Sequence, residues 1–261
     1  MFRHYINNLS RTSAALILFS SLSAQAISLS TYRIYLDNDS STASFIMFNK
    51  EALPQTCELD IVHRGFNEMG KMLRVDDAIT PTNSAAPWFR YSPRNFIAAP
   101  NLTQTVRFTL RRKANSAAAE YRSYLKVFCD TDEAPVTSES DLDQPKVGVK
   151  PHIIQNVPII VRTGKLNAQV NFSSMHLEGR QLSFTIHRKG NRSVYGTLEL
   201  VNKKNDEIVD YTRNISLYTE TKQLVQHLNT AGIPVNQLAL RFVEDEKYGG
   251  TIDYRQDVKL N

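Results

Sequence analysis

The chain has 261 residues and a formal net charge of +5, with 31 Lys and Arg residues against 26 Asp and Glu residues. The small excess of positive charge is scattered among acidic residues, so nucleic-acid binding has little support. The length suits one large domain or two of ordinary size, and no apolar run reaches membrane-spanning length, so we expect no membrane insertion.

The first predicted element is a secretory signal peptide over residues 1–26. Arg3 and Arg11 give it a basic start, residues 14–19 form a short apolar core, and an Ala-Gln-Ala triplet ends at Ala26. We therefore expect cleavage after Ala26 and export to an oxidising compartment.

Short strands are predicted along the next part of the chain. The segments are rich in Ile, Val, Phe, Tyr and Thr and are bounded by Asn, Asp, Pro and Gly. They cover residues 28–36, 43–49, 56–63, 94–98, 103–111, 120–129 and 146–162. Seven short strands in this length are typical of an immunoglobulin-like sandwich.

The two cysteines are Cys57 and Cys129. In an oxidising compartment one disulfide is the simplest interpretation, and two buried free thiols are the alternative. The third and sixth strands of an immunoglobulin-like sandwich are antiparallel neighbours. Cys57 lies near the start of the third predicted strand and Cys129 at the end of the sixth, so a bridge within one sheet is plausible.

The predicted strand 146–162 has an unusual pattern. Its even positions are mostly small or polar, with Ile154 and Ile160 as exceptions, so an extended chain would have one apolar face. The preceding residues, 130–145, form a spacer rich in acidic residues, Ser and Pro. A long apolar strand on such a spacer invites pairing with other chains. The apolar odd positions are Val147, Val149, Pro151, Ile153, Val157, Ile159 and Val161.

After residue 163 the strand pattern begins again. Strands are predicted over residues 168–172, 181–189, 193–202, 207–210, 215–218, 237–242 and 251–259. Residues 221–231 are either a short helix or an extended segment. We therefore predict an all-β protein with an immunoglobulin-like domain over 27–163 and a second β-sandwich domain over 164–261.

Catalytic and metal-binding patterns are not found in the sequence. The histidines lack the spacing of metal ligands, and there is no nucleophile elbow, phosphate-binding loop or zinc signature. We therefore expect no enzyme activity, no cofactor and no metal. Arg33, in the middle of a predicted strand, is either an exposed edge charge or an anchor for an anion.

From residue 28 to about 261 the chain resembles the periplasmic chaperones that assemble pili, or fimbriae, by the chaperone–usher pathway. The resemblance lies in the order and spacing of several motifs, and the departures from the common pattern resemble the archaic or alternative branch. The motifs are Arg33-Ile34-Tyr35, Pro93-Arg94 with Pro100, Gln104-Thr105-Val106-Arg107-Phe108, Glu120-Tyr121-Arg122-Ser123, and the long strand that ends at Arg162.

The resemblance implies two immunoglobulin-like domains set at an angle with a cleft between them. It also implies donor-strand complementation, in which the chaperone lends its seventh strand to a pilus subunit and delivers that subunit to an outer-membrane usher. Self-association of the free chaperone is left open, and no ATP is implied. The donated residues would be Val147, Val149 and Ile153, with Pro151 or Val157 as further members.

Family members hold the C-terminal carboxylate of the subunit with two basic residues. Arg33 matches the first, but Pro158 falls where the second, a lysine, is expected. We therefore assign Arg122, on the neighbouring strand, as the second cation. Arg162, which pairs with an acidic residue in the family, is then left without an assigned partner.

The sequence leaves two alternative functions. A pilus subunit or tip adhesin of the same system would usually be a single incomplete domain with its donor segment at the mature N-terminus, whereas the apolar stripe here is central. A secreted β-rich hydrolase would need a convergent set of catalytic residues, and the sequence offers none.

Overall fold

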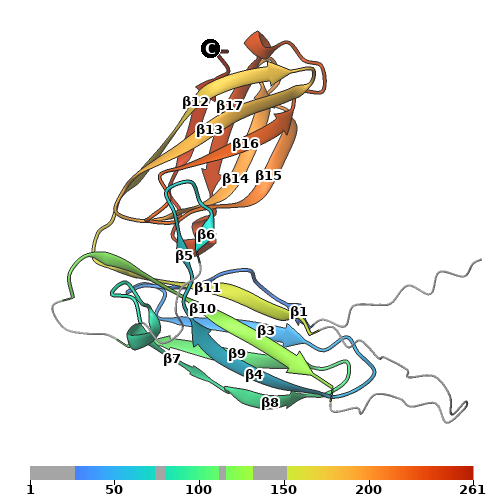
Figure 1. Cartoon of the computed structure of the whole chain (residues 1–261), viewed down its shortest axis with the longest axis vertical. Helices are drawn as coiled ribbons and strands as arrows, with labels where there is room; N and C mark the ends of the chain where they lie inside the picture. The colour runs from blue at the N-terminus through green and yellow to red at the C-terminus, as the bar shows by residue number, and fades with distance from the viewer. Residues whose placement is uncertain (1–26, 74–79, 112–115, 132–151, 261) are drawn as a thin grey trace, which may run out of the picture.

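A computed structural model describes residues 27–73, 80–111, 116–131 and 152–260. The chain forms two lobes set at an angle, with the N-terminal strands in one and the C-terminal strands in the other (Figure 1). The described residues are almost entirely β-structure, as predicted, and their helices are three short 3-10 turns. None of these helices has the length and hydropathy to cross a membrane. The predicted signal peptide and the predicted donor residues Val147, Val149 and Pro151 lie outside the described residues.

The first lobe is a sandwich of two sheets with immunoglobulin-like strand order. One sheet has the order β1-β3-β9-β7 and the other β2-β11-β10-β4-β8. The first sheet consists of β1 (Ser28–Leu29), β3 (Thr42–Phe48), β9 (Thr103–Leu110) and β7 (Phe89–Ser92), and β7 follows the 3-10 turn η1 (Ala86–Trp88). The second sheet consists of β2 (Ile34–Leu36), β11 (Ile154–Thr163), β10 (Ala119–Asp130), β4 (Gln55–Val62) and β8 (Asn95–Ala98).

The core of this sandwich follows from alternation along the strands. In β9, Val106 and Phe108 are fully buried while the residues between them are exposed. In β3, Phe45 and Met47 point to the same interior. Side chains alternate between the faces of a strand, so one face of each sheet fills the core and the other faces solvent or a neighbour.

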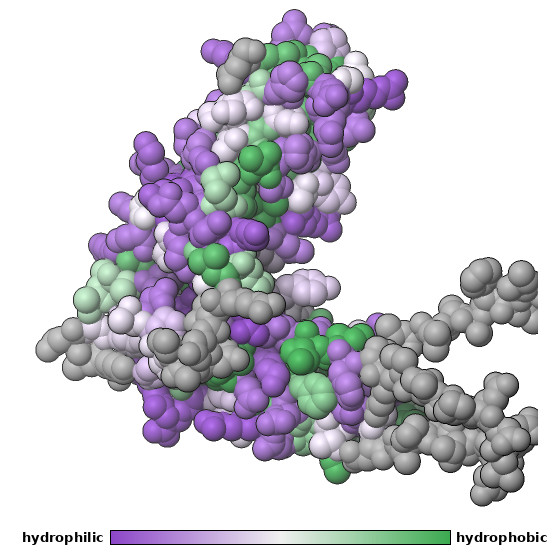
Figure 2. Space-filling view, in the orientation of Figure 1, coloured by the Kyte–Doolittle hydropathy of each residue, from purple (hydrophilic) through white to green (hydrophobic). Residues whose placement is uncertain are grey.

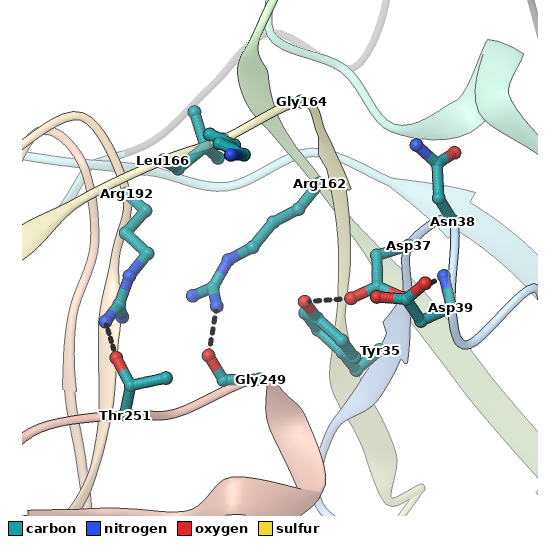
Figure 3. Close-up of a pocket in the computed structure, with 11 residues that line it drawn as sticks. Tyr35, Asp37, Asn38, Asp39, Arg162, Gly164, Leu166, Arg192, Gly249 and Thr251 are labelled. Atoms are coloured by element: carbon teal, nitrogen blue, oxygen red, sulfur yellow. Dashed lines mark hydrogen bonds between the residues drawn. The ribbon is translucent and has the colours of Figure 1, made fainter.

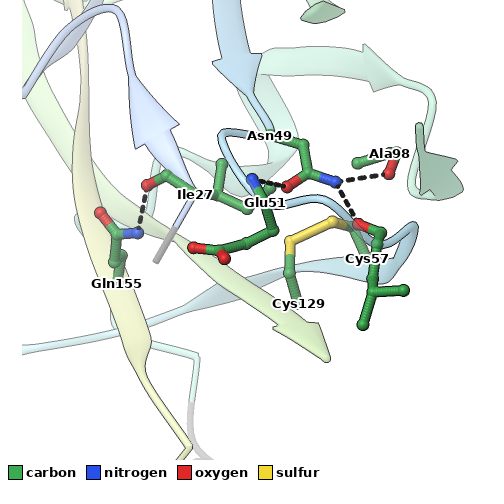
Figure 4. The surroundings of a disulfide bond; sticks show 8 residues. Ile27, Asn49, Glu51, Cys57, Ala98, Cys129 and Gln155 are labelled. Carbon is green, nitrogen blue, oxygen red and sulfur yellow. Dashed lines mark hydrogen bonds between the residues drawn. A yellow bond between two sulfur atoms is a disulfide. The ribbon is translucent and has the colours of Figure 1, made fainter. Parts of the chain in front are cut away.

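The predicted disulfide is present. Cys57 on β4 lies directly opposite Cys129 on β10 in the antiparallel register, and the two sulfurs are bonded. Figure 4 shows the bond near the buried Asn49, whose side chain donates to the carbonyl of Ala98. A loop of 72 residues closed in this way contributes about 4 kcal/mol in the chain-entropy model.

A small hairpin connects the two lobes. It is formed by β5 (Gly65–Phe66) and β6 (Met72–Leu73) and rises from the first lobe toward the second (Figure 1). At its tip the carbonyl of Glu68 accepts the backbone N–H groups of Lys222 and Gln223.

The second lobe is also a sandwich. One sheet consists of β12 (Ala168–Glu178), β13 (Gln181–Gly190) and β16 (Gln223–Asn229). The other has the order β15 (Ile208–Leu217), β14 (Val194–Asn202), β17 (Leu238–Glu244) and β18 (Asp253–Asp257). The 3-10 turns η2 (Val235–Gln237) and η3 (Glu246–Tyr248) flank β17. The two sandwiches have separate cores; Phe184 and Phe242 are central to the second.

Several predicted elements differ in detail. The predicted strand 28–36 is divided into β1 and β2, which belong to different sheets, so Arg33 lies just before β2 and not in the middle of a strand. Residues 207–210 and 215–218 were predicted as separate strands, but β15 runs through both. Its register with β14 shifts between Gly196 and Leu198, and Asn214 has a φ of 62°. The polar residues therefore lie in a β-bulge, and the strand continues beyond it. Residues 221–231, left open between helix and extended chain, contain β16, paired antiparallel with β13.

Candidate functional site: an open strand edge and two arginine clusters

The first half of β11 is paired on one side. Along β11 the backbone pairs with β10 from Ile154 to Thr163, whereas β2 pairs in parallel only with Ile159–Val161. Among the described residues, the segment 154–158 therefore has a strand neighbour on the β10 side alone. Ile154 is 51% exposed here, and Figure 2 shows hydrophobic side chains on this end of the first lobe. An edge of this kind can accept another strand.

The two faces of β11 have different surroundings. Val157 is buried with Ile159 in the first core, so its side chain belongs to this chain's own sandwich. Ile153, half-buried, lies just before β11 on the same alternating face as Val157. On the opposite face, Ile160 packs with Tyr35 and Tyr218 at the junction of the lobes. This contact explains why Ile160 is apolar although most even positions of the strand are small or polar.

The first group of charges at the junction is the Arg162 cluster, which we define as Glu120, Arg162, Ser193 and Gly249. Arg162 lies opposite Glu120 in the β10–β11 pair, and its Nε donates to Glu120 Oε2 at 2.8 Å. Its Nη1 donates to the carbonyl of Gly249 at 3.0 Å and its Nη2 to the carbonyl of Ser193 at 2.9 Å. Glu120 in turn accepts the backbone N–H of Ser193 at 3.1 Å. Both charges are buried and paired, and they join the two lobes.

A cavity of about 560 Å³ lies beside the Arg162 cluster. Figure 3 shows Arg162 and Arg192 on one side and Tyr35, bonded to Asp37, on the other. Arg192 donates to both oxygens of Glu244, at 2.6 and 2.8 Å. Both guanidinium groups in this cavity therefore already have acceptors.

The Arg33–Arg122 cluster, which we define as Arg33, Arg122, Tyr218 and Glu220, is the second group. Arg33 is 2% exposed, lies 4.2 Å from the ring centroid of Tyr195, and donates from Nη2 to Ser216 Oγ at 3.0 Å. Its Nε has no hydrogen-bond partner, and no carboxylate of the described residues pairs with it. A buried cation without a paired anion is costly, which is typical of a site that receives one.

Arg122 is held differently. Its Nη1 donates to Glu220 Oε2 at 2.9 Å, and its Nη2 donates both to Glu220 Oε1 and to the carbonyl of Arg64, the latter at 3.1 Å. The guanidinium carbons of Arg33 and Arg122 lie 5.7 and 4.1 Å from the ring centroid of Tyr218. The structure thus brings the two predicted cations to one aromatic ring.

The ionisation of the Arg122–Glu220 pair follows from these contacts. Burial alone would raise the pKa of Glu220, but its hydrogen bonds and charge interaction with Arg122 outweigh burial and hold the pKa below its ordinary value. Burial lowers the pKa of Arg122, and the bonds to Glu220 more than restore it, so that pKa is raised. Both groups are therefore ionised at neutral pH.

Several site residues were not foreseen from the sequence. Arg162 was left without an assigned partner, but it pairs with Glu120. Cross-strand register could have revealed this, since residues 120 and 162 face each other in an antiparallel pair. Tyr218 and Glu220 lie on the second lobe, and their proximity to Arg122 depends on how the lobes meet.

In the described ranges, no group of three or more His, Cys, Asp or Glu side chains could hold a metal ion.

Comparison with known proteins addresses the fold. No protein-family model matches the chain, and no curated protein sequence matches it. Among solved structures, the CupB2 chaperone of Pseudomonas aeruginosa is 10% identical, with 88% of this chain and 100% of that chain covered at a TM-score of 0.50. The YadV chaperone is also 10% identical, with 89% and 99% covered at a TM-score of 0.48. This chain therefore has the two-sandwich fold seen in the CupB2 chaperone.

Proposed function

We propose that this protein is a periplasmic chaperone that binds and folds pilus subunits by donor-strand complementation and delivers them to an outer-membrane usher. The observation that carries the proposal is the edge of β11, where β10 is the one strand neighbour of residues 154–158 among the residues that the structure describes. The alternating apolar sequence continues upstream of this edge, and the fold is shared with a protein described as a chaperone.

The open edge supplies two kinds of contact. Its backbone can pair with a strand of the subunit, and its apolar side chains can fill a groove in the subunit. Ile153 shares the face of Val157, and Val149 and Val147 continue that face by alternation, with Pro151 between them. Each buried aliphatic side chain contributes about 1.5–3 kcal/mol. Because Val157 is buried in this chain's own core, we leave it out of the donated set.

The Arg33–Arg122 cluster is the proposed anchor for the C-terminal carboxylate of the subunit. Arg33 is buried and its Nε lacks an acceptor, so a carboxylate would supply the missing anion. Arg122 shares the Tyr218 ring with Arg33 and can contribute a second pair of donors.

The domain boundary and the compartment belong to the same proposal. Gly164, with a φ of 64°, separates β11 from β12, which suits domains over 27–163 and 164–261. By this proposal, residues 1–26 direct export to the periplasm and are then cleaved off. The mass of the protein recovered from the periplasm should correspond to a chain that starts at Ile27.

The alternative of a pilus subunit or tip adhesin is less well supported. A pilus subunit that is a single incomplete domain would lack the last strand of its sandwich. Here β11, the seventh strand by sequence, is present in the first sandwich and pairs with β10 over ten residues.

Co-expression with a subunit encoded beside this gene tests the proposal. The chaperone should protect the subunit and be recovered in complex with it from the periplasm. Replacing Val149 and Ile153 by Asp should reduce recovery at least about tenfold, because charges cannot enter an apolar groove. The matched control is Ile97→Asp, an exposed apolar residue on β8 at the opposite edge of the same sheet, which should leave recovery unchanged. Equal recovery with all variants would overturn the proposal.

A further inference from the structure

We propose that Glu220 is an internal carboxylate that occupies the ligand-carboxylate site on Arg122, and that the C-terminal carboxylate of an incoming chain displaces it. The inference rests on the proposed function for the identity of the ligand. In this role Glu220 selects among ligands, because any carboxylate that binds Arg122 must compete with the Glu220 carboxylate already bound to it.

The geometry of the pair supports competition. Two terminal nitrogens of Arg122 each donate to a different oxygen of Glu220. This two-bond arrangement is the one that a guanidinium makes with any carboxylate, including the end of a polypeptide. Glu220 and a ligand carboxylate would therefore require the same donors.

The burial of the two partners is unequal. The side chain of Arg122 is 5% exposed, whereas that of Glu220 is 31% exposed. Glu220 thus approaches the arginine from the solvent side. Rotation of its side chain would return the carboxylate to water, where hydration replaces part of the lost interaction with Arg122.

The backbone around Glu220 is held independently of the ion pair. Arg188 donates from Nη2 to the carbonyl of Thr219 at 2.7 Å and from Nε to the carbonyl of Thr221 at 3.2 Å. Thr221 also donates its N–H to the carbonyl of Tyr218. The loop can therefore keep its conformation when the Glu220 side chain leaves Arg122.

The charge balance favours a second anion. Arg33 and Arg122 lie against one ring, and Glu220 is the carboxylate paired with this cluster among the described side chains. A single carboxylate satisfies Arg122 and leaves Arg33 Nε without an acceptor. A free carboxylate in solution would gain little by displacing Glu220. A chain that also pairs with β11 brings its carboxylate at high local concentration and can displace it.

Carboxylate binding can be measured without a subunit. The probes are sodium acetate and an N-acetylated tetrapeptide with a free C-terminal carboxylate, titrated into the full-length exported protein. The readout is the NMR shift of the Arg122 side-chain N–H signals, assigned with Arg122→Lys. Glu220→Gln should bind both probes at least about tenfold more tightly than the unmodified protein, because the competitor is gone. The C-terminal amide of the peptide should bind neither protein.

Glu68→Gln is the matched control. Glu68 also forms an ion pair between the lobes, with Lys222, but this pair is exposed and does not contact Arg122. Its variant should bind the probes like the unmodified protein. If Glu220→Gln does not fold, Glu220→Ser is measured in the same way, with a thermal melt to show folding.

The outcomes separate the two proposals. If the folded Glu220 variant and the unmodified protein bind the probes with equal affinity, the proposed role of Glu220 is wrong. The chaperone function would still be supported if the Val149 and Ile153 variant loses subunit recovery. If Glu220→Gln binds the probes more tightly but the unmodified protein recovers no subunit, Glu220 does occupy a carboxylate site. The chaperone function is then contradicted.

Discussion

The Arg162 cluster and the Arg33–Arg122 cluster lie at the same junction, but they differ in how completely their arginines are paired. Arg162 donates to acceptors from both lobes and faces Glu120 across a strand pair. Arg33 is at least as deeply buried, yet within the described part of the chain its Nε has no acceptor and no carboxylate pairs with it. A fully paired buried charge joins the domains, whereas an incompletely paired one suits a ligand.

The largest effect is expected from breaking the complete cluster. Arg162→Ala leaves Glu120 buried without its partner, so the free energy of unfolding should fall by about 3–5 kcal/mol. Urea unfolding measures this loss. Arg255→Ala removes an exposed pair with Asp206 and should cost less than about 1 kcal/mol. Equal losses would mean that the Arg162 cluster does not hold the lobes together.

Arg33→Met should separate binding from stability. Methionine keeps much of the volume and loses the Ser216 hydrogen bond and the two ring contacts of Arg33, but it also removes a buried cation that lacks a paired anion. These effects offset each other, so the free energy of unfolding should change by less than about 1 kcal/mol. Recovery of a co-expressed subunit should fall at least about tenfold, because the anchor is lost. Arg33→Lys keeps the charge without the two-bond geometry and should give intermediate recovery. Strong destabilisation by Arg33→Met would place Arg33 with the structural arginines.

Tyr218→Leu tests the ring that the two cations share. Losing two cation–π contacts should lower the free energy of unfolding by about 1–2 kcal/mol. The control is Tyr211→Leu, which removes a half-exposed ring near Arg213 and should cost about 0.5 kcal/mol. If both variants lose the same amount, the Tyr218 ring adds nothing specific to the cluster.

The smallest effect concerns pH. The pKa of Glu220 is depressed in the folded protein, so the Arg122–Glu220 pair contributes its full stability above the ordinary Glu value of 4.5. That contribution should be lost as pH falls from this value through the lower folded pKa. The difference in unfolding free energy between the unmodified protein and Glu220→Gln should therefore be constant from about pH 7 to 5.5 and shrink below about 4.5. A difference that already shrinks between pH 7 and 5.5 would contradict the pairing.

The fold could be predicted largely from local pattern. Alternating strands identified both sandwiches, and neighbouring strands placed Cys57 opposite Cys129. Local pattern was less informative where a strand contains a bulge. The polar residues before Ile215 suggested a loop, but the left-handed Asn214 lets β15 continue.

The candidate site was only partly predictable for a different reason. Arg33 and Arg122 were predicted from the sequence as the anchor, which stays a prediction, and the structure places both guanidinium groups against the Tyr218 ring. Glu220 is separated from Arg122 by 98 residues, and their contact forms only where the two lobes meet. The sequence pattern does not indicate how the two lobes are oriented, so the contact between Glu220 and Arg122 could not be predicted.

The β5–β6 hairpin has a consequence for how the protein avoids aggregation. The Glu68 carbonyl accepts the N–H groups of Lys222 and Gln223, where β16 begins at the outer edge of its sheet. Backbone donors already satisfied in this way are poor templates for a misfolded neighbour. Strand addition is thereby disfavoured at this part of β16 while the first half of β11 stays accessible. The two strand edges would therefore differ in how readily an aggregation-prone chain adds to them.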